Sequence, residues 1–220
     1  MGLDIKDWIQ ISSIVILASV AFIAPYVIER WRHAYRSPKL KISFRLSSPY
    51  CHKTQMIGEN FSFPAFYFRF MVENVGLTQA EDCEVFLEHI YRENSAGEMV
   101  PIKNFSPTNL KWSGLRDPFK RTFQPGRKIF CDIGRIHHPD HGYKSLYKDI
   151  SEKDQKKSKF IFEFPEIYYT QWDSLVPGKY KISVSIYSKN AEKVTRDFYI
   201  SWSGEWRDVE QDIFNELVIT

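Results

Sequence analysis

The first feature of the hydrophobic pattern is a long apolar run near the start of the chain. The twenty residues Ile9–Ile28 include no charged side chain. With a rise of about 1.5 Å per residue, a helix of this length spans the ~30 Å hydrocarbon core of a bilayer. Trp8 precedes the run, and Tyr26 and Trp31 lie at its far end, where aromatic residues favour the membrane interface. The pattern predicts a short tail over residues 1–8 and one transmembrane helix over residues 9–28.

Basic residues follow the apolar run and predict its orientation. Before the run, Lys6 is balanced by Asp4 and Asp7. After it, a juxtamembrane collar begins over residues 29–38, and its basic members are Arg30, Arg32, Arg36, Lys39 and Lys41. Because basic flanks stay on the cytoplasmic side, we expect a single-pass protein of the inner (plasma) membrane with its C-terminal domain in the cytoplasm. Each basic residue near the surface adds roughly 1 kcal/mol of attraction to the anionic lipid bilayer.

A cleaved signal peptide is the alternative explanation of the same run. Ser19-Val20-Ala21 fits the small-residue pattern of a cleavage site, and export would make the chain an envelope protein. However, the residues before the run lack a positive charge excess, and the run continues past Ala21. The basic collar also opposes export. A retained membrane anchor therefore fits more of the pattern.

After the collar, apolar and polar residues alternate with a period of two, which is typical of half-buried β-strands. In the clearest run, Tyr180, Ile182, Val184 and Ile186 alternate with Lys181, Ser183 and Ser185. Similar runs occur over residues 40–46, 66–72, 83–87, 129–133, 160–164 and 198–202. Turn-forming residues separate them, and no helical pattern of crossover length lies between them. We therefore predict a mainly β, antiparallel sandwich over residues 39–204.

Two stretches of this segment carry a recognisable pattern. The first is Val72-Glu73-Asn74-Val75-Gly76, followed by Ala80 and Val85-Phe86-Leu87. The second is Val176-Pro177-Gly178-Lys179-Tyr180-Lys181-Ile182-Ser183-Val184. They resemble the V-x-N-x-G … A … V-x-L pattern and the late PG-x-Y-x-L-x-V strand of bacterial immunoglobulin-like modules, of which the cell-adhesion-related (CARDB-like) domains are an example. The resemblance implies an immunoglobulin-like sandwich, and it implies no single function, because such modules have many roles.

Residues 205–220 show a helical rather than a strand-like pattern. Val209, Ile213 and Leu217 recur every four residues, which places them on one face of a short amphipathic helix. Such a face either docks onto the sandwich or serves self-association or partner binding. The sequence leaves both interpretations open.

Two insertions, over residues 101–125 and 134–158, interrupt the strand pattern, and long loops in compact domains are usually either functional or disordered. The second insertion includes His137, His138 and His141, which are candidate ligands for a transition metal. Because these residues are nearly adjacent and stand in a Pro-Gly context, a solvated turn is the simpler interpretation.

Basic and aromatic residues are interleaved at the end of the first insertion and into the next strand. The basic ones are Arg116, Lys120, Arg121, Arg127 and Lys128. Phe119 and Phe123 lie between them. Aromatic stacking combined with positive charge can bind a small anionic ligand such as a nucleotide. A strand with a polar outer face has the same pattern, so that alternative stays open.

Composition argues against several classes of function. The 30 basic and 27 acidic residues are too evenly balanced to favour nucleic acid as a partner. Cys51, Cys83 and Cys131 are widely spaced, form no CxxC motif and suit a reducing compartment, with Cys83 and Cys131 as small core residues. No motif typical of hydrolases, P-loop enzymes, dinucleotide-binding proteins or metalloproteases occurs. We therefore predict no enzyme activity, no catalytic residues and no cofactor.

These features together favour a membrane-anchored binding or assembly module that recognises a protein partner or a second copy of itself at the inner membrane face. The alternative is a membrane effector or sensor. In that case the soluble domain binds a small anionic ligand such as a nucleotide, and the helices oligomerise through faces that carry Ser12, Ser13 and Ser19. The exported envelope protein is the third hypothesis.

Overall fold

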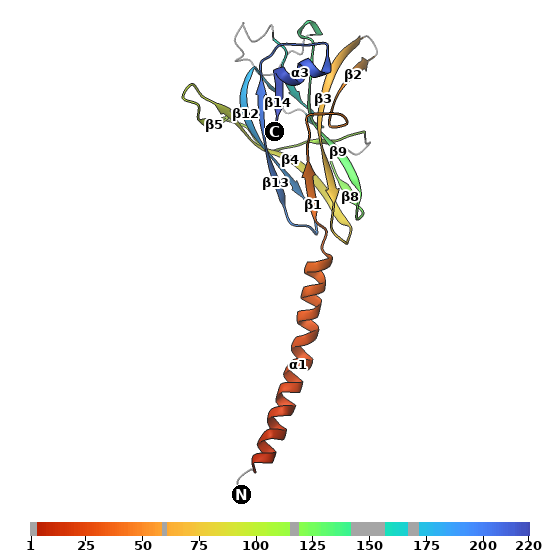
Figure 1. Cartoon of the computed structure of the whole chain (residues 1–220), viewed down its shortest axis with the longest axis vertical. Coiled ribbons are helices and arrows are strands. Elements are labelled where there is room, and N and C mark those ends of the chain that lie inside the picture. Colours follow the sequence, from red (N-terminus) through yellow and green to blue (C-terminus); the bar gives the residue numbers. More distant parts are fainter. Residues whose placement is uncertain (1–3, 59–60, 115–118, 142–156, 167–171) are drawn as a thin grey trace. The chain divides into compact units, whose positions relative to one another are not determined.

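The computed structural model divides the chain into two compact units, Met1–Ser37 and Pro38–Thr220. The structure describes residues 4–58, 61–114, 119–141, 157–166 and 172–220, except for the side chains of residues 5–11, 14, 32–35, 58, 61 and 141. In the described part of the chain, the first unit is a helix and the second unit carries the strands (Figure 1). We call the second unit the β-domain.

The first unit consists of α1 (Ile5–Arg36), a helix of 32 residues. It covers the whole of the predicted segment 9–28 and continues through most of the predicted collar. Pro25 lies inside the helix, where it removes one backbone hydrogen bond. The Ser19 hydroxyl donates to the Val15 carbonyl at 2.8 Å, so Ser19 is satisfied within the helix. Within the described residues, no helix is both long enough and apolar enough to cross a membrane, so the predicted crossing is not confirmed.

Seven strands form the first sheet of the β-domain. They are β1 (Leu40–Ser43), β2 (Cys51–Gly58), β3 (Phe61–Asn74), β7 (Lys111–Trp112), β9 (Lys128–His137), β10 (Phe160–Phe162) and β11 (Ser174–Leu175). The sheet order is β1-β3-β9-β10-β11. The strands β1 and β2 pair with the same edge of β3, β1 with residues 71–74 and β2 with residues 61–68. The strand β7 pairs with β9.

Seven further strands form the second sheet. They are β4 (Ala80–Glu93), β5 (Met99–Pro101), β6 (Thr108–Asn109), β8 (Arg121–Phe123), β12 (Gly178–Tyr187), β13 (Val194–Trp202) and β14 (Leu217–Ile219). The order is β14-β13-β12-β4-β5, and β6 and β8 also pair with β4. Every described strand pair in both sheets is antiparallel, which confirms the predicted mainly β, antiparallel fold.

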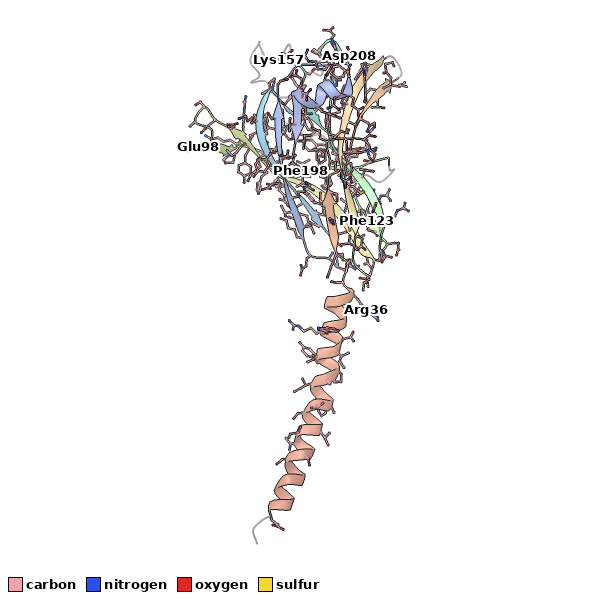
Figure 2. The ribbon with its side chains drawn as sticks, viewed as in Figure 1. Arg36, Glu98, Phe123, Lys157, Phe198 and Asp208 are labelled. Carbon is pink, nitrogen blue, oxygen red and sulfur yellow. The ribbon has the colours of Figure 1, made fainter. Side chains whose placement is uncertain are left out.

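The inner faces of the two sheets share one hydrophobic core. Phe70 of β3 and Phe198 of β13 stack across it with ring centroids 5.7 Å apart, and Figure 2 labels Phe198. The alternation read from the sequence is confirmed in β3, where Phe66, Phe68, Phe70 and Val72 are buried and Tyr67, Arg69 and Glu73 are half-buried. In β12 the apolar residues of the alternation are buried as well, and so are Ser183 and Ser185, which form hydrogen bonds to Asp197 and Thr195 of β13. Cys83 and Cys131 are fully buried core residues, as predicted. Burial raises the pKa of Cys83 to about 11 and that of Cys51 to about 12, so these thiols stay protonated.

The end of the chain differs from the prediction. The helix expected over residues 205–220 is limited to α3 (Glu210–Glu216), and the last residues form β14, which pairs with β13. The physical reason is that β13 offers a free edge at this point, and a strand satisfies more backbone groups there than one more helical turn would. Leu217 and Ile219 are buried and Val218 is exposed, which is the alternation of a strand.

The first insertion is part of the fold rather than a loop. Residues 101–125 contribute β6, β7 and β8, and Leu110 and Trp112 are fully buried. The second insertion starts within β9 and continues into the 3-10 helix η1 (Pro139–His141). Residues 142–156 of that insertion lie outside the described residues.

Candidate functional site

The two predicted metal ligands whose side chains are described, His137 and His138, belong to no metal site among the described residues. His137 is buried and packs against Phe63, with ring centroids 5.1 Å apart. The Nδ1 atom of His138 lies 3.4 Å from a carboxylate oxygen of Asp140. The side chain of His141 is outside the described part of the structure. Among the described residues, no group of three metal-ligating side chains is placed to hold an ion.

The predicted anion-binding residues are divided between the two sheets. Arg116 lies outside the described residues. Lys120 forms an ion pair with Glu84 at 3.2 Å, and Arg121 belongs to β8 in the second sheet. Arg127 and Lys128 lie at the start of β9 in the first sheet. The four described residues of this set are therefore divided between the two sheets.

The structure instead joins part of the collar to part of this basic stretch. We call the end of the β-domain where β1 begins the proximal end. There, Glu73 of β3 is paired with Lys41 of β1 on one side and Lys128 of β9 on the other. The Nζ atom of Lys128 is 3.5 Å from the Glu73 carboxylate. Lys39 and Arg127 come directly before these two strands, so four basic residues far apart in the sequence gather here. Of the remaining collar residues, Arg30 and Arg36 are exposed on α1, and the side chain of Arg32 is not described.

Asn74 holds the proximal end together. It is fully buried at the end of β3. Its side-chain oxygen accepts from the backbone amides of Lys39 (3.2 Å) and Gly76 (3.0 Å). Its side-chain nitrogen donates to the carbonyls of Thr78 (2.7 Å) and Phe123 (3.0 Å). One side chain therefore fixes the start of β1, the turn over residues 75–79 and the end of β8, which gives the Asn of the V-x-N-x-G pattern a structural role.

Two apolar side chains project from the turn that Asn74 organises. Val75 is 51% exposed and Leu77 is 58% exposed. By contrast, the turns over residues 94–97 and 188–190 consist mainly of polar and small residues. We call Val75, Leu77, Lys39, Lys41, Arg127 and Lys128 the proximal tip. Glu73 is the acidic residue that lies among them.

A second group of polar residues occupies the outer face of the first sheet. The strand register aligns them in two rows, His52–Tyr67–Arg135 and Arg69–Asp132–Lys111. Arg135 also forms an ion pair with the buried carboxylate of Glu163. We call the six aligned residues the outer polar cluster. Sequence reasoning missed the cluster: alternation marks its members as outward-facing, but their neighbours across the sheet depend on register.

Burial shapes the protonation of this cluster. The Asp132 carboxylate accepts a hydrogen bond from the Ser113 hydroxyl at 2.5 Å, yet burial raises the pKa of Asp132 above its ordinary value. His52 stacks on Tyr67 with ring centroids 6.4 Å apart. Burial lowers the pKa of His52, and the positive charge of Arg69 lowers it further. His52 Nδ1 has no hydrogen-bond partner among the described residues. The cluster thus combines aromatic rings with cations, the chemistry expected of a site for planar anions.

The outer face of the second sheet carries ordered aromatic side chains. The Tyr187 hydroxyl donates to Glu88 at 2.5 Å, and the ammonium of Lys193 lies 4.8 Å from the centre of the Tyr187 ring. On the same face, Lys181 lies over the Tyr91 ring at 4.4 Å. Tyr187 is exposed and Tyr91 is half-buried. Tyrosines that already make such contacts are typical anchors of protein–protein interfaces, because little entropy is lost when they bind.

The predicted self-association residues lie at the other end of the β-domain, which we call the distal end (Figure 1). Ile213 and Leu217 are fully buried, so these two side chains pack onto the β-domain instead of being available for self-association. Val209 is exposed. Trp206 covers Phe66, with ring centroids 5.3 Å apart. Ion pairs at this end join Lys53 to Asp208 at 3.7 Å and Lys157 to Glu205 at 3.5 Å, and Figure 2 labels Lys157 and Asp208.

Comparison with known proteins identifies no family. No known family and no curated protein match the sequence. A solved structure described as "X-ray structure of Northeast Structural Genomics Consortium target SoR45" is 10% identical to this chain. The match covers 79% of this chain and 92% of that chain, with a TM-score of 0.28. A score this low carries no argument about fold or function, and the resemblance to immunoglobulin-like modules stays a prediction.

Proposed function

We propose that this chain is a membrane-anchored binding or assembly module, and that α1 holds the β-domain at the cytoplasmic face of the inner membrane. The observation that carries the proposal is the exposure of apolar side chains along α1. Phe22 is 84% exposed and Trp31 is 73% exposed, and the large apolar residues between them are also more than half exposed. Each Å² of apolar surface left exposed to water costs about 25 cal/mol of free energy.

A lipid bilayer is the environment that best suits the exposed apolar side chains of this helix. The exposed residues belong to the twenty-residue run without charge, Ile9–Ile28, except for Trp31, which lies three residues after the run. The hydrocarbon interior of a membrane accepts apolar side chains on every side of a helix, whereas a protein partner covers one face. Arg30 and Arg36 follow the run and favour a cytoplasmic location for the β-domain.

Recognition by the β-domain is proposed to use its outer surfaces. The space between the sheets is filled by large side chains, including fully buried Trp112, Tyr180 and Phe160. A packed interior of this kind leaves a protein partner or a second copy of the chain to bind from outside. The ordered face with Tyr187 and Tyr91 has the aromatic composition that protein interfaces favour.

The second candidate function is that of a membrane effector or sensor for a small anionic ligand. The outer polar cluster favours it, because Arg135 pairs with Tyr67 in the register beside the stacked His52 ring, and Arg69 follows two residues after Tyr67 on the same strand. A nucleotide would be bound by charge and stacking together. Titration of the full chain with nucleotides, compared with the Arg69→Gln variant, tests this candidate, which fails if neither protein binds.

Membrane attachment is tested by fractionating cells that express the full chain. We expect the wild type to stay in the membrane fraction after a high-salt wash. The double variant Val20→Lys/Ile23→Lys should move to the soluble fraction, because two charges in the apolar run oppose insertion. Val209→Lys, a charge placed on another exposed apolar position, is the control and should stay in the membrane. A soluble wild type, or a membrane-bound Val20→Lys/Ile23→Lys variant, would show that α1 is not the anchor.

Orientation and partner binding need separate measurements. A reporter fused after Thr220 that is active only in the cytoplasm should give signal, and one active only outside should not. The opposite result would favour the exported envelope protein. Cross-linking of the full chain in native membranes should capture a second copy or a protein partner, and the Tyr187→Ala variant should reduce the yield. A chain that stays monomeric and captures nothing would refute the binding module.

A further inference from the structure

We propose that the proximal tip docks the β-domain onto an anionic lipid surface. This inference rests on the proposed membrane attachment and adds a second contact with the membrane, made by the β-domain itself. It assigns a binding role to residues that the sequence divided between a collar and a nucleotide-binding stretch.

The apolar part of the tip is the first reason. Single exposed apolar residues are common on protein surfaces and need no explanation. Here Val75 and Leu77 are both more than half exposed, and both project from one short turn. Apolar side chains presented this way can enter the boundary between lipid headgroups and acyl chains, where their burial favours binding.

The rigidity of the turn is the second reason. Asn74 makes four side-chain hydrogen bonds to the segments around it. The backbone adds two more contacts, because the Val75 amide donates to the Lys39 carbonyl at 2.8 Å and the Gly126 amide donates to the Asn74 carbonyl at 2.7 Å. These hydrogen bonds hold the turn with its apolar residues exposed, so docking would lose little further conformational entropy.

The charge around the turn identifies the partner as anionic. Lys39, Lys41, Arg127 and Lys128 give four positive charges, and Glu73 gives one negative charge among them. Lys39 and Arg127 form no ion pair with a described residue, so both are available to a partner. An apolar centre ringed by lysine and arginine matches a surface of anionic headgroups over hydrocarbon.

Acidic residues at the same end do not cancel this charge. Glu81 is paired with Lys189 at 3.5 Å. Asp82 is exposed on β4, beyond the turn that carries Val75 and Leu77. At physiological ionic strength the Debye length is about 8 Å, so the charges nearest the apolar pair dominate the attraction that lipid experiences.

Chain connectivity gives the tip access to the membrane surface. Three peptide units join Arg36, the last residue of α1, to Lys39. At 3.8 Å per unit, the Cα atom of Lys39 lies within about 11 Å of that of Arg36, however the two units are oriented. If α1 is anchored in a bilayer, Lys39 and the turn bonded to it are confined near that bilayer.

The direct test uses residues 38–220, because the described core is made of residues from the β-domain alone, so this part is expected to fold without α1. Vesicles of phosphatidylcholine mixed with phosphatidylserine are compared with vesicles of phosphatidylcholine alone. We expect cosedimentation with the mixed vesicles that weakens as salt is added. The double variants Val75→Ser/Leu77→Ser and Arg127→Gln/Lys128→Gln should each reduce vesicle affinity about tenfold.

Two matched controls distinguish binding by the proximal tip from nonspecific binding through any exposed apolar side chain or positive charge. Val218→Ser removes an exposed apolar side chain elsewhere, and Lys103→Gln/Lys179→Gln removes two positive charges elsewhere. Both should leave vesicle binding unchanged. Equal loss with control and tip variants would overturn the proposal. So would the absence of any preference for phosphatidylserine.

A second measurement guards against an isolated domain that binds too weakly to sediment. The full chain is placed in nanodiscs of the same two lipid compositions, and amide hydrogen exchange of residues 75–79 is followed. Slower exchange in the phosphatidylserine nanodiscs supports docking, and equal exchange in both refutes it. If the full chain fractionates with membranes while both docking tests fail, membrane anchoring by α1 is supported and docking by the tip is refuted. If the full chain is soluble but its β-domain binds vesicles, the tip binds lipid and α1 is not a membrane anchor. Protection caused by a protein partner or a second copy would be independent of lipid composition.

Discussion

The two ends of the β-domain differ in how they present apolar side chains. At the distal end, Ile213 and Leu217 are fully buried, although they belong to the last residues of the chain. At the proximal end, Val75 and Leu77 are more than half exposed, although buried Asn74 holds their turn in place. Val209 at the distal end is also exposed, so the contrast concerns where the exposed residues lie: the proximal pair projects from a turn that Asn74 holds and that basic residues surround. The difference therefore indicates that the proximal apolar residues are exposed for a binding partner.

The same contrast appears in the charges. At the distal end, Lys53 and Lys157 are each paired with an acidic residue from the segment next to α3. At the proximal end, Lys39 and Arg127 form no ion pair with a described residue. Paired charges stabilise a fold only slightly, whereas unpaired charges of one sign create a field that reaches beyond the molecule. Three of the four predictions below test this contrast, and the other concerns the outer polar cluster.

The largest effect is expected from Asn74→Ala. The substitution leaves buried backbone groups at the start of β1, in the turn and at the end of β8 without their partner. We expect a loss of about 3–5 kcal/mol in the free energy of unfolding, measured by urea titration of the β-domain. Asn94→Ala is the control, because Asn94 also accepts from two backbone amides, at 2.9 Å each, but in an exposed turn. A cost for Asn74→Ala no larger than that for Asn94→Ala would show that Asn74 does not organise the proximal end.

Leu217→Ala tests the distal end. The side chain is fully buried on β14, and its removal leaves a cavity that the surrounding strands fill only in part. A loss of about 2–5 kcal/mol is expected by the same urea titration. Val218→Ala, a change at the neighbouring exposed position, should cost much less. Similar values for the two would mean that β14 is not docked as described.

A smaller effect concerns the outer polar cluster and pH. The pKa of His52 is lowered below 6.5 in the folded protein by burial and by Arg69, while Glu210 and Asp132 oppose the shift. The folded state therefore binds fewer protons than the unfolded state just below pH 6.5, and stability is lost as the pH falls through that value. Because His52 is partly exposed, the loss should stay below about 1 kcal/mol. His52→Gln should flatten this part of the stability–pH curve, and an unchanged curve would contradict the assignment.

The smallest effect is expected from Leu77→Ala. This change matches Leu217→Ala in chemistry, but the side chain is exposed, so the free energy of unfolding should change by less than about 0.5 kcal/mol. Thermal melting of the β-domain is sufficient to check it. A cost close to that of Leu217→Ala would mean that Leu77 packs within the domain, and the contrast between the two ends would be lost.

Much of the scaffold could be predicted from the sequence. Alternation identified the buried side of β3 and β12 and the core positions Cys83 and Cys131, because a strand turns each successive side chain to the opposite face. The apolar run predicted a helix over residues 9–28, and α1 covers it. The helix predicted over residues 205–220 was wrong at both ends. Residues 205–209 are not helical, and residues 217–219 have both a helical and a strand pattern, of which the edge of β13 favoured the strand.

Most of the candidate site could not be predicted. Lys39 and Lys41 were assigned to a collar, and Arg127 and Lys128 to a separate anion-binding stretch. The pairing of β1 and β9 on the two edges of β3 brings them together around Glu73. The outer polar cluster depends in the same way on the register of β2, β3, β9 and β7.

The sequence by itself determined which residues of each strand are buried and where a long helix forms, because both follow from periodicities of a few residues. Tertiary structure decided which strands are neighbours, and thereby gathered the proximal tip and ended the C-terminal helix at Glu216. Register and strand order depend on contacts between segments more than fifty residues apart in the chain, such as Glu73 with Lys128. A local pattern cannot encode those contacts, since a strand with one apolar face can pair with many others.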